Sequence, residues 1–532
     1  MKRNYFVCGL LALFGSLNMQ AAVDFTVNGI NYSVTDSAVV SVAADTAYKG
    51  AIIIPATVPY DGVDYAVTAI ADKAFYYCTG VTSVTLPESV TELGYGAFRN
   101  CSGMTSISLP SSLKKIGSSA FYGCKSLASI SIPAAVDSIK PYTFYGCEAL
   151  TSVNVPNNVV ALGGSAFVNC FSLQSVVLPD ALTEIGSYTF QNCTKLSSIN
   201  IPANAVSIGD YAFMNCASLP SVTLPEGLKR IGTRAFEFCL GLETLNLPST
   251  LTNIAGSTFN SCPGLKNISV ADGNPVYSSP GNCNAVIEAI KDPKTDEVTY
   301  KLIYGCANTV IPAGVTEIGR YAFYNCVLLG GIVIPEGVTV INNYAFYGCG
   351  NMTSVSLPES LTDIGDYAFC RCRGLIDIQI PNSVTSINEG AFGECSSLST
   401  VTVPASVKDI EDFAFAYCTN LTDFYCLAEN CPKATEDAFL ETPIEDIALY
   451  VPAASVDKYE LDALWGMFKS INSLGGYEVA PNRDAETAID NLKGDAKIVS
   501  VYSLGGQQNA RMQRGINIVR MSDGTTRKVL KQ

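Results

Sequence analysis

The sequence contains no histidine and one tryptophan among 532 residues, and only 15% of the residues are charged. Histidine is the side chain most used for acid–base chemistry near neutral pH, and it is the commonest nitrogen ligand of metals. Its absence excludes many enzyme classes, and no spacing of carboxylates or lysines indicates another chemistry. We therefore expect a protein that is not an enzyme and that has no cofactor and no metal site.

Positive charge is also scarce. Lysine and arginine together number 33 against 48 aspartates and glutamates, which gives a formal net charge of -15. A chain of this charge is unsuited to tracking nucleic-acid phosphates or to binding anionic lipid through basic patches. Hydrophobic residues nevertheless make up 48% of the sequence, which is enough to bury a continuous core. The composition predicts a folded protein that does not bind nucleic acid.

Long apolar runs are missing except near the start of the chain. There, the basic pair Lys2 and Arg3 precedes an apolar stretch over residues 5–17 and two small residues. This order is typical of a secretory signal peptide, here residues 1–22, and no other stretch approaches the ~18 apolar residues of a transmembrane helix. The mature protein is expected to be secreted, or to be associated with the outer membrane or the cell surface, without a transmembrane segment.

A repeat of 23 residues fills most of the remaining chain, and it runs without a slip in two blocks. Proline, phenylalanine and cysteine each recur with this period. The phenylalanines are Phe75, Phe98, Phe121, Phe144, Phe167, Phe190, Phe213, Phe236 and Phe259, then Phe323, Phe346, Phe369, Phe392 and Phe415. A fixed period of this length predicts a solenoid, in which each unit buries its apolar face only by stacking on its neighbours.

The residue order within one unit, 109–132, predicts its local structure. The apolar spacing over residues 127–132, followed by Pro133, indicates a short strand with alternate side chains inward. A second short strand is expected around residues 113–116, and residues 120–124 fit a single helical turn. Stacked units of this kind would form parallel ladders on two sides.

The unit, written LPxxLxxIGxxAFxxCxxLxxIxI, resembles the bacterial surface-protein class of leucine-rich repeat, the BspA-like class, over roughly residues 50–470. The resemblance implies a leucine-rich-repeat solenoid of mostly short parallel β-strands with single helical turns, curved and capped at both ends. It also implies export to the surface of a Bacteroidetes-like bacterium and a role in adhesion. The expected partners are host extracellular proteins or bacterial surface proteins.

Fourteen of the twenty cysteines lie three residues after the phenylalanines. Export favours disulfides, and coils ~4.8 Å apart are within bridging distance. Side chains in one row point the same way, however, which suits the disulfide torsion poorly, so a ladder of buried free thiols is the favoured interpretation. Cys283 and Cys306 lie outside the period and are a possible pair.

The period also predicts the domain organisation. Asn28-Gly29 indicates a hairpin near the start, and the runs 284–290 and 298–303 indicate paired strands inside an insertion. Trp465 is expected to pack on the last coil instead of offering a ligand platform. The expected segments are a signal peptide (1–22), an N-terminal β cap (23–70), a first repeat block (71–262), an insertion (263–311), a second repeat block (312–424), a C-terminal cap (425–474), a linker (475–496) and a terminal β module (497–532).

The last 36 residues resemble the C-terminal sorting domains of type IX secretion substrates. Asn517 departs from the usual pattern, in which an aromatic residue is commoner, and a plain terminal β module is the alternative. The positions that carry the resemblance are Val501, Tyr502, Gly505, Gly515, Ile516, Ile518, Val519, Lys528 and Val529.

Two rows of residues are candidates for binding because packing of the coils does not require them. The first row is aromatic and lies two residues before the phenylalanines: Tyr142, Tyr188, Tyr211, Tyr321, Tyr344 and Tyr367. The second row is small and polar and lies on the predicted strands: Ser129, Ser131, Ser152, Asn154 and Asn200. A flat hydroxyl-rich strip suits a broad protein or glycan contact better than a small-molecule pocket, whereas the tyrosines either bind or merely seal the edge. We expect a cell-surface adhesin or interaction scaffold; the alternative is a surface glycan-binding protein for nutrient capture.

Overall fold

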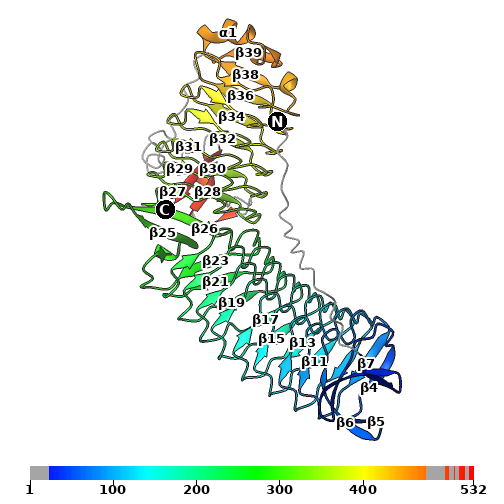
Figure 1. Ribbon diagram of the computed structural model, residues 1–532. Helices are drawn as coiled ribbons and strands as arrows, with labels where there is room; N and C mark the ends of the chain where they lie inside the picture. Colours follow the sequence, from blue (N-terminus) through cyan, green and yellow to red (C-terminus); the bar gives the residue numbers. More distant parts are fainter. Residues whose placement is uncertain (1–22, 475–497, 503–507, 510–514, 522–525, 532) are drawn as a thin grey trace.

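The computed structural model describes residues 23–474 and, between residues 498 and 531, the backbone of four strands. It is a parallel β-solenoid of about 19 turns with very little helix (Figure 1). The expected solenoid class is therefore confirmed. The predicted signal peptide (1–22) and the predicted linker (475–496) lie outside the described residues, as does Gly505 of the tail.

Each coil contributes one strand to a row that we call the strand face, where neighbouring strands pair in parallel with matching residues of adjacent coils opposite each other. Its strands are β4 (Gly50–Ile53), β7 (Val81–Thr85), β9 (Ser106–Ser108), β11 (Ser129–Ser131), β13 (Ser152–Asn154), β15 (Ser175–Val177), β17 (Ser198–Ile199), β19 (Ser221–Thr223), β21 (Thr244–Leu247), β23 (Asn267–Val270), β28 (Gly331–Val333), β30 (Ser354–Ser356), β32 (Asp377–Gln379), β34 (Thr400–Val403), β36 (Asp423–Cys426), β38 (Ala448–Val451) and β39 (Ser470–Ser473).

A second row, the short-strand row, is built from strands of two residues that also pair in parallel. Its second residue, usually isoleucine or leucine, points into the core, as at Ile116 and Ile364. The strands are β8 (Glu92–Leu93), β10 (Lys115–Ile116), β12 (Ser138–Ile139), β14 (Ala161–Leu162), β16 (Glu184–Ile185), β18 (Ser207–Ile208), β20 (Arg230–Ile231), β22 (Asn253–Ile254), β27 (Glu317–Ile318), β29 (Val340–Ile341), β31 (Asp363–Ile364), β33 (Ser386–Ile387), β35 (Asp409–Ile410) and β37 (Lys433–Ala434).

On the third side of each coil, the prediction of a helical turn is wrong. Residues 118–123 form consecutive turns instead, because Ser119 and Gly123 have φ of 58° and 70°, in the left-handed region, which no α-helix contains. Alternate backbone N–H groups then point to the next coil: Phe121 donates to the Thr143 carbonyl at 2.9 Å. The same alternation recurs along the solenoid. We call this side, from three residues before each ladder phenylalanine to two after it, the turn edge.

The N-terminal strands close the first coil. Asn28 and Gly29 form the turn between antiparallel β1 and β2, as the sequence predicts. β6 runs parallel to both β3 and β8, so the cap continues directly into the short-strand row. The cap strands are β1 (Phe25–Val27), β2 (Ile30–Asp36), β3 (Val39–Val42), β5 (Thr57–Tyr60) and β6 (Val63–Ile70).

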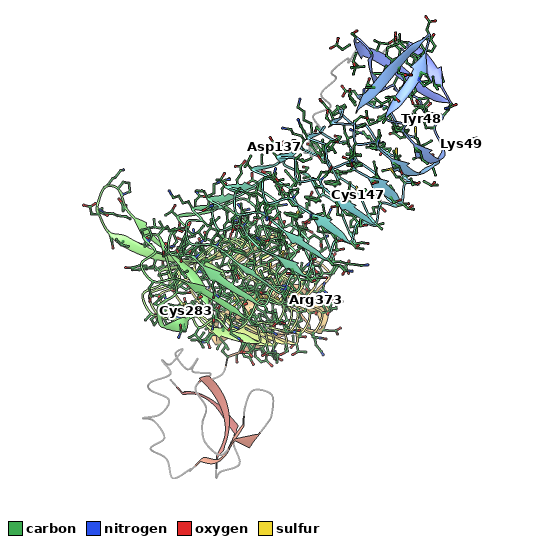
Figure 2. All side chains as sticks on the ribbon, turned by 90° about the horizontal axis from the view of Figure 1, so that it is seen from below. Tyr48, Lys49, Asp137, Cys147, Cys283 and Arg373 are labelled. Carbon is green, nitrogen blue, oxygen red and sulfur yellow. The ribbon has the colours of Figure 1, made fainter. Side chains whose placement is uncertain are left out.

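The insertion contains β24 (Tyr277–Ser278), the 3-10 helix η1 (Pro280–Asn282), β25 (Ala285–Lys291) and β26 (Val298–Gly305). β25 and β26 pair antiparallel, as predicted, and the hairpin projects beyond the body of the solenoid (Figure 2). Buried residues form two separate hydrophobic clusters that divide at this insertion. The two blocks meet there at an angle, with the arrows of β11 to β23 on the outer side of the bend (Figure 1).

The C-terminal cap consists of η2 (Ile444–Asp446), η3 (Ala453–Ser455), α1 (Val456–Glu460) and η4 (Trp465–Met467). Trp465 is 1% exposed, stacks on Phe468 at 5.6 Å and donates its indole N–H to the Pro432 carbonyl at 3.0 Å. The prediction that Trp465 packs on the last coil is therefore confirmed. The tail strands β40 (Ile498–Tyr502), β41 (Gln508–Asn509), β42 (Gly515–Met521) and β43 (Thr526–Lys531) form one antiparallel sheet in the order β41-β40-β42-β43.

Candidate functional site: the turn edge

A ladder of phenylalanine rings lies under the turn edge. Within each block, neighbouring rings stack nearly parallel, for example Phe346 on Phe323 at 4.8 Å and on Phe369 at 5.0 Å. The cysteine three residues later donates its S–H to the phenylalanine carbonyl of the preceding coil, as Cys216 does to Phe190 at 3.3 Å. The row therefore serves two purposes, because each thiol fills apolar space and satisfies a buried carbonyl.

All cysteines of the described residues are free, so the structure agrees with the thiol interpretation. Burial raises the pKa of the Cys216 thiol far above its ordinary value of 9.0. Cys283 and Cys306 are also free, and the Cys306 thiol donates to the Lys266 carbonyl at 3.0 Å. Cys147 lies inside the coil stack and Cys283 in the insertion (Figure 2). Among the described residues, no group of three or more cysteines and carboxylates is placed to hold a metal ion.

The six candidate tyrosines all have left-handed backbone conformations, with φ between 55° and 62°. They do not form one continuous strip. Tyr188 stacks on Tyr211 at 4.7 Å, and Tyr344 stacks between Tyr321 and Tyr367 at 5.4 and 5.2 Å. The Tyr142 ring meets that of Tyr145 at a tilt and is not stacked, and its side chain is 46% exposed. The sequence position is shared, but the rings divide into three groups.

A second row of tyrosines lies one residue after the phenylalanines, and it was not among the residues predicted from the sequence. Tyr324 stacks on Tyr347 at 5.0 Å, and Tyr122 stacks on Tyr145 at 4.6 Å. Tyr321 meets Tyr324 edge to face at 5.4 Å. Counting aromatic residues at every position of the period, instead of at one, would have revealed this row.

Arginines complete the aromatic surface of the second block. The Arg320 guanidinium lies 4.7 Å from the centre of the Tyr321 ring, and that of Arg371 lies 5.4 Å from the centre of Tyr347. Tyr367 ends the stack, because its ring lies over Gly390, where a Cβ atom would overlap the ring, and its hydroxyl bonds to Glu389. Burial and then this carboxylate raise the pKa of Tyr367 well above its ordinary value. We call Tyr321, Tyr324, Tyr344, Tyr347, Tyr367, Arg320 and Arg371 the tyrosine cluster.

The polar candidates lie on the strand face. Ser129 and Ser131 are exposed and lie opposite Ser152 and Asn154 in the parallel register. Asn200 differs from the others, because its amide bonds to both the backbone N–H and the carbonyl of Leu178 at 2.7 Å. Asn200 therefore has a structural partner, whereas the four remaining residues form a flat, weakly charged strip.

Comparison of the sequence with known protein families identifies the repeat. The model of the BspA type leucine rich repeat region matches residues 68–197, 183–309, 294–422 and 339–460. The chain belongs to the BspA-type leucine-rich repeat family. No curated protein matches the sequence significantly.

Among solved structures, this BspA-type chain is similar to a leucine-rich repeat protein from Bacteroides ovatus ATCC 8483. The two are 30% identical over 76% of this chain and 94% of that one, with a TM-score of 0.53. A leucine rich cell surface protein from Faecalibacterium prausnitzii A2-165 is 25% identical over 76% of this chain and 94% of its own, with a TM-score of 0.47.

BspA-type repeat proteins are cell-surface or secreted binding scaffolds, and membership of this family suggests a general role in protein interaction for the chain. None of the described helices is long and apolar enough to span a membrane.

Proposed function

We propose that the protein is exported to the bacterial surface, where it acts as an adhesin or interaction scaffold. In this proposal, the tyrosine cluster on the turn edge of the second block binds a protein of the host or of a neighbouring bacterium. The observation that supports it is the composition of the cluster, five tyrosines and two arginines over adjacent coils. Tyrosine and arginine are enriched at the centres of protein interfaces, where they supply most of the binding energy.

The backbone supports a functional origin of these tyrosines. A left-handed conformation is unfavourable for residues with a Cβ atom and favours glycine or asparagine. At the same position, other coils carry Gly96, Ser165 or Gly390, with φ near 60°. The coil conformation therefore does not require an aromatic ring, and large side chains at Tyr321, Tyr344 and Tyr367 call for another reason, which a binding surface provides.

The ring geometry favours a protein partner over a glycan. Sugars pack on open aromatic faces, but here the rings of Tyr321, Tyr344 and Tyr367 cover each other's faces. What the cluster offers to a partner is ring edges, hydroxyl groups and guanidinium groups, which suit a polar protein surface. The polar strip of the strand face, formed by Ser129, Ser131, Ser152 and Asn154, is the second candidate surface, although serine is depleted at interfaces.

The experiment is a binding screen of the chain without residues 1–22 against extracellular-matrix proteins, bacterial surface fractions and polysaccharides. For any protein that binds saturably, the triple variant Tyr321→Ser, Tyr344→Ser, Tyr347→Ser is expected to weaken binding by about tenfold or more. The matched control is Tyr188→Ser with Tyr211→Ser, an equivalent stack in the first block. Serine is suitable at Tyr321 and Tyr344 because Ser119 and Ser165 already occupy the same left-handed position.

Two outcomes would contradict the proposal. Binding confined to polysaccharides would favour the nutrient-capture alternative. Protein binding that is lost in the Tyr188 and Tyr211 control, or in a variant with Ser129, Ser131 and Ser152 changed to alanine, would place the contact elsewhere on the solenoid.

A further inference from the structure

The strand face begins at β4 (Gly50–Ile53), and this first strand is paired on one side only. Its sheet has the order β4-β7-β9, so β7 is the single partner of β4 among the described residues. The N-terminal cap extends the short-strand row instead, because β6 pairs with both β3 and β8. The outer edge of β4 therefore lies at the N-terminal end of the solenoid without a neighbouring strand (Figure 1).

The hydrogen bonds of β4 show which backbone groups this edge presents. Ile54, directly after the strand, donates its N–H to the Thr85 carbonyl of β7 at 3.0 Å. Successive residues of a strand direct their N–H and C=O groups to alternate sides, so those of Ala51 and Ile53 point away from β7. Within the described part of the chain, these groups have no hydrogen-bond partner. The edge therefore offers two donors and two acceptors to an added strand.

The outward side chains of β4 differ from those of the strands that follow. Ile53 is 73% exposed, whereas the next coils carry Thr85, Ser108 and Ser131 at its position. An exposed apolar residue on an unpaired edge invites pairing with another chain, and natural proteins usually protect such edges with charge. No charged residue occurs in β4. The strand at the end of the row therefore carries the features of a pairing edge.

A groove with a volume of about 280 Å³ lies beside this edge. It is lined by residues 51–53 of β4, by residues 27–30 of the turn between β1 and β2, and by Pro55 and Val58. Most of these lining residues are apolar. Unpaired backbone groups next to an apolar groove are what β-strand addition uses, because the backbone hydrogen bonds supply affinity and the groove accepts an alternate side chain.

The surroundings of the edge favour a single extended segment over a second copy of the chain. The β1–β2 turn lies across the groove from β4, so an added strand has to enter between the two. The β4 edge of a second copy is flanked by the same turn. At the opposite end of the strand face, α1 packs against β39. Neither end strand of the strand face in a second copy is therefore suited to this groove, whereas a segment without flanking structure is.

We propose that the outer edge of β4 is a docking site for one extended segment of a partner protein, which adds a strand to the strand face. The backbone groups of Ala51 and Ile53 exchange hydrogen bonds with the segment. An apolar side chain of the segment fills the groove against Val27, Ile30 and Val58. This site belongs to the first coil and shares no residue with the tyrosine cluster, so it does not depend on the proposed function.

The test uses a peptide probe, so that it does not require the natural partner. The fluorescein-labelled peptide Lys-Val-Thr-Val-Thr-Val-Lys-amide is titrated with the chain without residues 1–22 and followed by fluorescence anisotropy. The matched peptide is N-methylated at its three central residues, which keeps side chains and charge but removes the backbone donors of both edges. We expect a Kd of roughly 100 μM for the probe, at least about tenfold tighter than for the matched peptide.

Protein variants and hydrogen exchange then locate the site. Ile53→Lys places a charge on the edge and should weaken probe binding by about tenfold or more. Val177→Lys is the matched control, because Val177 is also 73% exposed on the strand face but its strand, β15, pairs on both sides. It should leave probe binding unchanged. In the unsubstituted chain, the probe should slow amide hydrogen exchange at Ala51 and Ile53, and this measurement needs no variant.

The remaining outcomes overturn the inference. No binding of the probe, or equal binding of the N-methylated peptide, means that the edge does not add a strand. Equal losses in Ile53→Lys and Val177→Lys, or exchange that slows only in other segments, mean that the probe binds elsewhere. A dimer of the chain alone that Ile53→Lys dissociates would identify a second copy as the occupant. If the probe binds as expected and no protein depends on the tyrosine cluster, the docking site stands and the proposed function fails.

Discussion

The interior ladder and the turn edge belong to the same coils, yet they use residues in opposite ways. Two residues apart in sequence, one position is phenylalanine in all fourteen coils, whereas the other changes from coil to coil although its backbone stays left-handed. The residues at the variable position are Lys73, Gly96, Ser119, Tyr142, Ser165, Tyr188, Tyr211, Arg234, Ser257, Tyr321, Tyr344, Tyr367, Gly390 and Phe413.

The difference separates what the fold requires from what it permits. A solenoid coil is stable only when its apolar face stacks on its neighbours, so the interior position admits one shape. The turn-edge position needs only a backbone conformation, which glycine, serine and lysine also adopt here. Large side chains on the turn edge are therefore available for binding. Substituting one residue at each of the two positions tests whether the interior position is structural and the turn-edge position is not.

The largest effect is expected for Phe346→Ala. The Phe346 ring is fully buried and stacks on both neighbouring rings, so its removal leaves a cavity in the middle of the second block. The free energy of unfolding should fall by about 3 to 5 kcal/mol, measured by denaturant unfolding. Tyr344→Ala, two residues earlier in the same coil, is the control and should cost about 1 kcal/mol or less. Equal losses in the two variants would contradict the division.

The second-largest loss of stability is expected for the cysteine row, because each thiol both fills apolar space and donates a hydrogen bond to a buried carbonyl. Cys216→Ala removes the sulfur and its hydrogen bond to the Phe190 carbonyl, which should lower the free energy of unfolding by about 2 kcal/mol. The cap coil indicates which residue can replace it: Thr442 lies three residues after Phe439, and its hydroxyl donates to the Phe415 carbonyl at 2.7 Å.

Cys216→Thr should therefore recover about 1 kcal/mol of the loss in Cys216→Ala. A threonine variant less stable than the alanine variant would show that the row is selected for apolar volume alone. Thiol titration is an independent check. The thiols of the ladder should react only after denaturation, because they are buried and free.

How far the sequence predicts this structure depends on the range of the interactions involved. The period places Phe346 and Cys216 inward because each coil repeats the same local pattern. The same pattern cannot distinguish a helical turn from consecutive turns, because Ser119 and Gly123 are compatible with both, and the choice depends on hydrogen bonds to the next coil.

In the candidate site, too, the sequence predicts what the local repeat determines and does not predict what distant contacts determine. The turn-edge tyrosines could be found by counting, since their position is fixed by the period. The burial of Glu237 and Asn260 could not be predicted in this way, because the same repeat position is half-buried at Tyr122 and buried at Val168 and Ala416, so the period does not fix its exposure. Contacts across 64 residues, such as Asn325 with Ser261, leave no mark on a local pattern.

Glu237→Gln tests this burial through stability and is expected to have a smaller effect. Burial raises the pKa of the Glu237 carboxyl above its ordinary value of 4.5, with Arg234 acting against the shift. An acid whose pKa is higher in the folded state favours folding at low pH, and this contribution is lost as the pH rises through the folded pKa. The glutamine variant should therefore match the parent near pH 4 and be more stable at pH 7 by about 1 kcal/mol. A glutamine variant that is less stable at pH 7 would show that Glu237 is satisfied in the folded protein.

The smallest effect is expected for Tyr142→Gly, and its sign is the informative part. Tyr142 has φ of 60° and is 46% exposed, and its ring makes only a tilted contact with Tyr145 at 6.2 Å. Glycine relieves the left-handed strain, which is worth about 1 kcal/mol, but it also loses the ring contact and gains freedom in the unfolded chain. These terms nearly cancel, so the midpoint of thermal unfolding should change by no more than about 2 °C. Tyr344→Gly is the matched change inside the cluster, where two stacked neighbours are lost, and it should be more destabilising than Tyr142→Gly, by about 1 kcal/mol at most. If Tyr142→Gly proved as destabilising as Tyr344→Gly, the tyrosines would be structural throughout the turn edge, and the binding surface would have to lie on the strand face.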